Sequence, residues 1–89
     1  MNSVTTEKFR HAYAKLPEHI QERARKTYSI WKKDMNYPAL QFKQIHSTKP
    51  VYSIRITLSY RAIGVKEGNT LIWFWIGSHS EYNKLIASL

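Results

Sequence analysis

The hydrophobic period of this chain changes once, near Pro38, and that change limits the folds open to it. Before Pro38, apolar residues recur three and four positions apart, which predicts helices. After it they alternate with polar residues, which predicts strands, until a last short helical stretch. Helices and strands grouped in this way are typical of an α+β fold with an antiparallel sheet. The 89 residues fit a single domain, 1–89.

Two helices are predicted in the first half. The first covers about 6–15, with Thr5 or Thr6 as its N-cap. The second follows Pro17 and stops before Tyr37-Pro38, because a residue that precedes proline disfavours the helical conformation. Its apolar face comprises Ile20, Ala24, Thr27, Tyr28 and Trp31. The short link between the two helices predicts an antiparallel helical hairpin.

The second half predicts strands. They cover about 40–46, 52–58, 60–66 and 70–76, and the last is apolar on both faces, as expected of a central strand that Gly77 ends. Only Met1 to Val4 precede the first helix, so there is little or no room for a further strand. We therefore expect a helical hairpin packed on a three- to four-stranded antiparallel sheet.

A short C-terminal helix is predicted after the strands. Ser78-His79-Ser80-Glu81 has the form of a capping box, which marks a helix start. Four residues of this helix are expected to face the core: Tyr82, Leu85, Ile86 and Leu89.

Charge and composition restrict the class of protein. Fourteen Lys and Arg oppose six Asp and Glu, giving a net charge of +8, which favours a polyanionic or acidic partner. The absence of cysteine excludes disulfides and Cys-based sites, and four scattered histidines predict no metal site. We expect no cofactor.

Nothing in the sequence predicts a membrane or secretion signal. The segment from Met1 to Arg10 has no apolar core of a signal peptide. The longest apolar run, Leu71 to Ile76, is far shorter than the roughly 20 residues of a membrane span. A cytoplasmic protein is therefore expected.

Several short motifs occur together in one order. Tyr52-Ser53-Ile54-Arg55-Ile56 precedes Tyr60-Arg61-Ala62-Ile63, and Trp73-Phe74-Trp75-Ile76-Gly77 precedes His79 to Tyr82. With Lys15-Leu16-Pro17 in the helical half, this pattern resembles the RelE/ParE family of bacterial toxins over nearly the whole chain. Family members commonly begin with a strand before the first helix, for which this sequence leaves little room.

The resemblance implies the toxin of a type II toxin–antitoxin system, held inactive in a hetero-oligomer by an acidic cognate antitoxin. RelE-like members cleave mRNA on the ribosome and so inhibit translation, whereas ParE-like members block DNA gyrase by binding and are not nucleases. Fold alone does not separate the two. We favour the endoribonuclease, with the gyrase inhibitor as the alternative. A member without toxic activity, acting only as a basic binding module, is the third hypothesis.

Metal-free RNA cleavage needs groups that activate the 2′-OH, stabilise phosphate charge and protonate the leaving 5′-oxygen. Arg55 and Arg61 match the family's arginines and suit phosphate. His79, at the start of the last helix, is the acid–base candidate. Tyr82 lies one helical turn further and either positions substrate or packs in the core. These side chains should converge around one phosphodiester; the general base stays open.

Other cations suit RNA or ribosome contact. Lys43 and His46 lie on the first predicted strand, and a basic helix face is either solvated or contacts the ribosome: Arg23, Arg25, Lys26, Lys32 and Lys33. Trp73 and Trp75 could stack on bases, but their central strand favours a core position for at least one.

Overall fold

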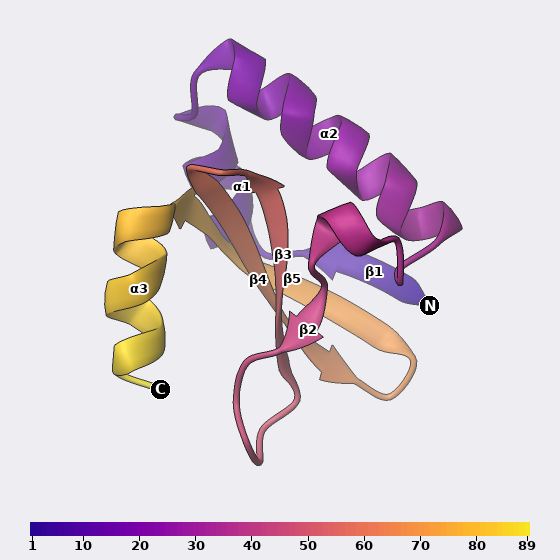
Figure 1. The fold of residues 1–89 in the computed structure, drawn as a ribbon. Helices are drawn as coiled ribbons and strands as arrows, with labels where there is room; N and C mark the ends of the chain where they lie inside the picture. Colours follow the sequence, from indigo (N-terminus) through magenta and orange to yellow (C-terminus); the bar gives the residue numbers. More distant parts are fainter.

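The structure, a computed structural model, describes residues 1–89 as a sheet between two helical layers (Figure 1). The elements in chain order are β1 (Asn2–Thr5), α1 (Glu7–Ala14), α2 (Glu18–Lys33), a short 3-10 helix η1 (Pro38–Leu40), β2 (Lys43–Gln44), β3 (Val51–Thr57), β4 (Tyr60–Glu67), β5 (Thr70–Ser78) and α3 (His79–Ala87). The predicted α+β class, with a helical hairpin and a short C-terminal helix, is confirmed.

The sheet has five strands in the order β1-β5-β4-β3-β2, and β1 runs parallel to β5. The expectation of three to four antiparallel strands was wrong in number and in direction. The missed strand, Asn2–Thr5, has no clear alternation of apolar residues. Backbone hydrogen bonds hold it: Asn2 donates to the carbonyl of Asn69, and the N–H of Thr6 donates to that of Trp73.

The segment after α2 is less extended than predicted. Instead of a strand over 40–46, only Lys43–Gln44 pairs with β3. Pro38–Leu40 forms the turn of 3-10 helix, and Gln41 adopts a left-handed conformation with φ 47°. Leu40, which the prediction placed in a strand, lies in this 3-10 helix and is buried in the core.

The hairpin covers one face of the sheet. Thr6 caps α1 by accepting a hydrogen bond from the N–H of Phe9 at 3.0 Å. α1 packs on β5 and α2 packs on β3. Edge-on contacts between aromatic rings anchor α2, where Trp31 lies 5.5 Å from Trp73 between ring centres. The core on this face consists of Trp31, Leu40, Ile54, Ile56, Ala62, Leu71, Trp73 and Ile76.

α3 packs on the opposite face, where its Tyr82 forms a smaller buried cluster with Val51 and Ile63 of the sheet. An irregularity in β5 supports this second layer. Ile63 pairs with Trp75 and Gly64 pairs with Trp73, so Phe74 has no partner in the register. Because of this bulge, Phe74 and Trp75 both pack toward the α3 side.

The capping box predicted at Ser78 is confirmed. The Ser78 hydroxyl accepts from the N–H of Glu81 at 3.2 Å, and the Glu81 carboxylate accepts from the N–H of Ser78 at 3.4 Å. Two neighbouring expectations were wrong. β5 continues through Gly77, where a Cβ would lie only 2.7 Å from the Trp75 ring. Leu89 is 46% exposed because α3 ends two residues earlier.

None of the helices has both the length and the apolar content that crossing a bilayer requires.

A matched pair of substitutions tests the position of the main core. Leu71 has no exposed surface, so Leu71→Ala should lower the free energy of unfolding by about 2–5 kcal/mol through lost burial and a residual cavity. Leu58, at the β3–β4 turn, is 78% exposed, and Leu58→Ala should change it by less than about 0.5 kcal/mol. Urea denaturation of both variants measures the difference; similar losses would contradict the packing described.

Candidate phosphate-binding face

Two arginines lie directly opposite each other on neighbouring strands. Arg55 of β3 pairs with Arg61 of β4, and both side chains therefore project from the same face of the sheet. That face is the one on which α3 packs, because the Arg61 guanidinium lies over the Tyr82 ring of α3. The chain's one ion pair joins His11 to Glu7, so no carboxylate neutralises either arginine.

Arg61 is held in place, but not all of its hydrogen-bond donors have partners. Its guanidinium carbon lies 5.6 Å from the centre of the Tyr82 ring, a cation–π arrangement. Its Nη1 donates to the side-chain oxygen of Gln41 at 3.3 Å. Its Nε is buried without a hydrogen-bond partner. A fixed, charged fork without a carboxylate partner is well suited to an anion.

His79 is the first residue of α3, as the capping box predicted. Its N–H donates to the Ser59 carbonyl at 2.7 Å, which ties the start of α3 to the β3–β4 turn. Its ring contacts two residues of its own helix. The Nδ1 atom lies 3.2 Å from the amide nitrogen of Asn83, and the ring centre lies 5.6 Å from that of Tyr82.

Tyr82 links the two sides of this arrangement. Its side chain is buried, and its hydroxyl donates to the Ser53 hydroxyl at 3.2 Å inside the core. The ring contacts both the Arg61 guanidinium and the His79 imidazole. Of the two roles open to Tyr82, the structure therefore supports packing, with the ring as a common support for the two candidates.

The structure adds a third cation and sets one candidate apart. Lys43 pairs with Ser53, so its side chain shares the face of Arg55 and Arg61. His46 does not join them. Its Nδ1 accepts hydrogen bonds from the backbone N–H groups of residues 48 and 49, at 3.1 and 2.9 Å, and so closes the loop before β3.

The basic residues of α2 lie on the other side of the sheet from this face (Figure 1). Five exposed cations belong to this separate group: Arg23, Arg25, Lys26, Lys32 and Lys33. The structure therefore divides the predicted cations between two faces. Trp73 is buried in the main core, as expected for at least one of the two tryptophans, and Trp75 is half-buried beside Gly77.

Three residues that support this face were not predicted from the sequence. Ser53 receives the Tyr82 hydrogen bond, Gln41 accepts from Arg61, and Asn83 contacts His79. Ser53 could have been found, because it lies two positions before Arg55 on one strand and must share its face. No pattern in the sequence indicated Gln41, because its contact with Arg61 depends on the left-handed backbone conformation that Gln41 adopts after the 3-10 helix.

Comparison with known proteins decides the family. The model of the ParE-like toxin domain matches residues 18–84, which is most of the chain. The chain belongs to this family. The assignment agrees with the RelE/ParE resemblance in the sequence and identifies a toxin of this type. No curated protein matches the chain in sequence.

Several solved structures share the fold of this ParE-like toxin. The RelB–RelE antitoxin–toxin complex from Methanococcus jannaschii matches with a TM-score of 0.75 and 19% identity, over 92% of this chain and 96% of that one. The YoeB/ParE toxin from Agrobacterium tumefaciens gives 0.68 and 16%, over 89% and 99%. The E. coli RelBE complex gives 0.64 and 15%, over 85% and 93%. At such identities the likeness shows the fold.

The buried tyrosine pair offers a test of this face. Tyr82→Phe keeps the ring under Arg61 and His79 but leaves the fully buried Ser53 hydroxyl without a partner. The free energy of unfolding should fall by about 1 kcal/mol. Tyr37 is 47% exposed, so Tyr37→Phe serves as the control and should leave stability unchanged. Equal stability of the two variants in urea denaturation would contradict the buried hydrogen bond.

Proposed function

We propose that this chain is the toxin of a type II toxin–antitoxin system and acts as a ribosome-dependent mRNA endonuclease that inhibits translation in the cytoplasm. An acidic antitoxin holds it inactive in a hetero-oligomer. The observation that supports the catalytic proposal is the unneutralised pair Arg55 and Arg61, on the same face as His79.

The arginine pair favours a bound anion on electrostatic grounds. Like charges directly opposite each other on neighbouring strands repel and destabilise the pairing. No carboxylate of the chain relieves this repulsion. A phosphodiester between Arg55 and Arg61 would relieve it and would receive charge-assisted hydrogen bonds from their guanidinium groups.

The reaction that fits this face is transfer of the phosphoryl group to the neighbouring 2′-oxygen of the RNA. The 2′-oxygen attacks phosphorus as a general base removes its proton, the bond from phosphorus to the 5′-oxygen breaks, and an acid protonates that oxygen. The products are a 2′,3′-cyclic phosphate and a 5′-hydroxyl end. Arg55 and Arg61 stabilise the charge on the phosphate, and His79 transfers a proton as acid or base.

Other residues of this face take supporting roles. Tyr82 positions Arg61 and His79 through its buried ring, and Asn83 orients the His79 imidazole through Nδ1. Lys43 extends the cationic surface along the neighbouring strand and contacts the RNA backbone. The α2 cations and His46 contribute to affinity for RNA or the ribosome rather than to catalysis.

Gyrase inhibition is the alternative function. Both the matched family model and one fold neighbour have ParE in their descriptions. In this reading the same cations contact protein or DNA without chemistry, and His79 has no role as acid or base. Expression should then damage DNA without loss of mRNA.

The decisive experiment is mapping of cellular RNA 5′ ends after the toxin is expressed. Arg61→Ala and His79→Ala should each lower transcript cleavage by about 100-fold or more and restore growth, because each removes a reacting or charge-stabilising group. Lys8→Ala, which removes an exposed cation of α1 outside the proposed RNA-binding set, is the control and should cleave like wild type.

Two further variants separate the roles. Arg61→Lys keeps the charge but loses the fork, so cleavage should stay well below wild type. Tyr82→Phe should retain cleavage, because the ring remains. Normal cleavage by both Arg61→Ala and His79→Ala would refute the mechanism, and absence of new 5′ ends with wild type would refute the nuclease function.

A further inference from the structure

The loop between β2 and β3, residues 45–50, projects beyond the end of the sheet (Figure 1). Every residue from Ser47 to Pro50 is exposed, so burial does not determine the shape of the loop. Two side chains fix it instead, because Gln44 and His46 form hydrogen bonds with the loop's own backbone. An exposed segment held in one conformation has already lost the conformational entropy that binding would otherwise cost.

These bonds converge on the backbone of Lys49. Its N–H donates to Nδ1 of His46 at 2.9 Å, and its carbonyl accepts from Nε2 of Gln44 at 2.9 Å. The same carbonyl accepts from the N–H of Val51 at 2.8 Å, at the start of β3. Lys49 is the one Lys or Arg of this loop. The hydrogen bonds therefore fix the point from which its ammonium group extends.

His46 serves this loop as an acceptor and not as a cation. Its Nδ1 receives two backbone N–H groups, those of Thr48 and Lys49, so this nitrogen carries no proton in the conformation described. The imidazole is therefore neutral here, with its proton on Nε2. The positive charge that the loop presents is that of Lys49.

The part of the chain around this loop contains no acidic residue. Residues 35–66 include β2, β3 and most of β4, and Glu67 is the first acidic residue after them. The Lys and Arg of this stretch are Lys43, Lys49, Arg55, Arg61 and Lys66. Cations grouped in this way without carboxylates favour a polyanion along the surface.

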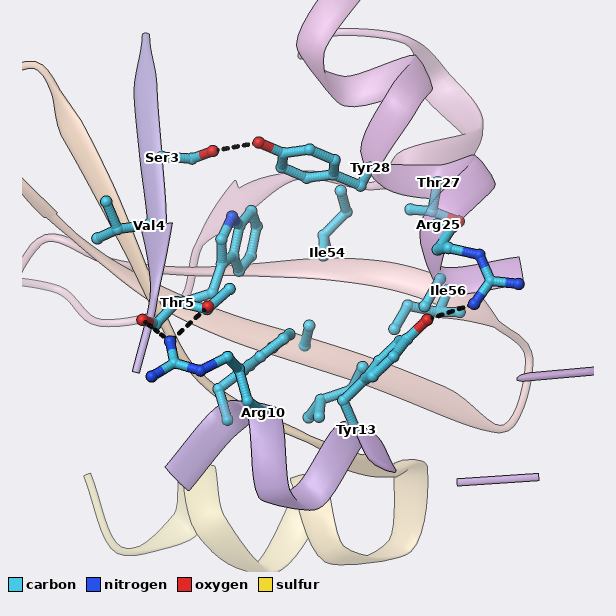
Figure 2. Close-up of a pocket in the computed structure, with 15 residues that line it drawn as sticks. Ser3, Val4, Thr5, Arg10, Tyr13, Arg25, Thr27, Tyr28, Ile54 and Ile56 are labelled. Atoms are coloured by element: carbon cyan, nitrogen blue, oxygen red, sulfur yellow. Dashed lines mark hydrogen bonds between the residues drawn. The ribbon is translucent and has the colours of Figure 1, made fainter. Parts of the chain in front are cut away.

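The two lysines of this region are free for an external anion. Lys43 and Lys49 are exposed, and no carboxylate pairs with either of them. Figure 2 shows a contrast on the other side of the sheet, where Arg10 and Arg25 border an apolar cleft between α1 and α2. Both of these guanidinium groups donate to oxygen atoms of the chain itself, at 2.7 Å each.

We infer that Lys49 is a second phosphate contact, outside the cleavage site, for the RNA strand that the arginine pair holds. His46 and Gln44 are the residues that position it. The inference rests on the proposed function for the presence of that RNA strand. It assigns the β2–β3 loop to substrate binding and leaves the chemistry with the arginine pair and His79.

A nucleic-acid strand suits this surface because its charges repeat along its length, and the cations follow in the same order. Lys43 pairs with Ser53, two residues or about 7 Å along β3 from Arg55, and the loop begins beyond it. A protein partner suits the loop less, because the exposed residues from Ser47 to Pro50 offer no aromatic or large apolar anchor.

Removal of the lysine tests the contact. A labelled single-stranded oligoribonucleotide is titrated with toxin that contains His79→Ala, which leaves the RNA uncut, and fluorescence anisotropy gives the affinity at several salt concentrations. Lys49→Ala should lower the affinity about fivefold and reduce the slope of log K against log salt by about 0.7, the share of one phosphate contact. Lys8→Ala, at an exposed position of α1, should change the affinity less than about twofold.

Replacement of His46 separates its acceptor from any charge. His46→Asn keeps a side-chain oxygen that accepts from the N–H two residues further on, so the affinity should stay within about twofold of wild type. His46→Lys adds a charge but no acceptor, and should lower the affinity about threefold because the loop is no longer preorganised. His46→Ala should do the same, but should have no effect in a chain that already contains Lys49→Ala.

An unchanged affinity in Lys49→Ala, or a loss no larger than that of Lys8→Ala, would overturn the inference. Tighter binding by His46→Lys than by wild type would assign His46 to direct contact and refute its positioning role. If Lys49→Ala weakened binding of a poly-glutamate chain equally, the loop would attract any polyanion and the assignment to RNA would be wrong. Failure of the nuclease proposal would appear separately, as wild-type toxin whose RNA binding depends on Lys49 but which cleaves no transcript.

Discussion

The structure depends on the central strand β5, which is enclosed on both faces and paired on both edges. It pairs in parallel with β1 and antiparallel with β4, and it contacts α1 on one face and α3 on the other. The unpaired Phe74 lets this one strand serve two cores, because the bulge sends Trp73 to the hairpin side and Phe74 with Trp75 to the α3 side. Loss of this strand would separate all three layers.

The double layering divides the cationic surface of this toxin. One face holds Arg55 and Arg61 beside α3, and the other holds the apolar cleft bordered by Arg10 and Arg25. With a single ion pair, between His11 and Glu7, the chain keeps all of its Lys and Arg free of carboxylates. Self-repulsion of this kind lowers the stability of a small domain, and external anions relieve it. Both faces therefore favour the binding of anions.

Prediction from sequence succeeded where a local rule governs the residues. Helical spacing located both hairpin helices, and the capping box at Ser78 located α3 and with it His79. It failed where a distant partner decides the conformation. β1 exists because β5 offers a free edge, and the left-handed turn at Gln41 replaces most of the predicted first strand. Leu89 was assigned to the core because its spacing continues the stripe of α3, but the helix ends before it.

The sequence by itself determined the charge, the α+β class and the identity of the candidate groups, because these follow from composition, from apolar periodicity and from short motifs. The tertiary structure alone decided which groups meet. Strand register sets Arg55 opposite Arg61, and the packing of α3 brings Tyr82 between Arg61 and His79. The sheet separates them from the α2 cations, which lie on its other side. Register and layer contacts join residues far apart in the chain, and no local pattern records such distances.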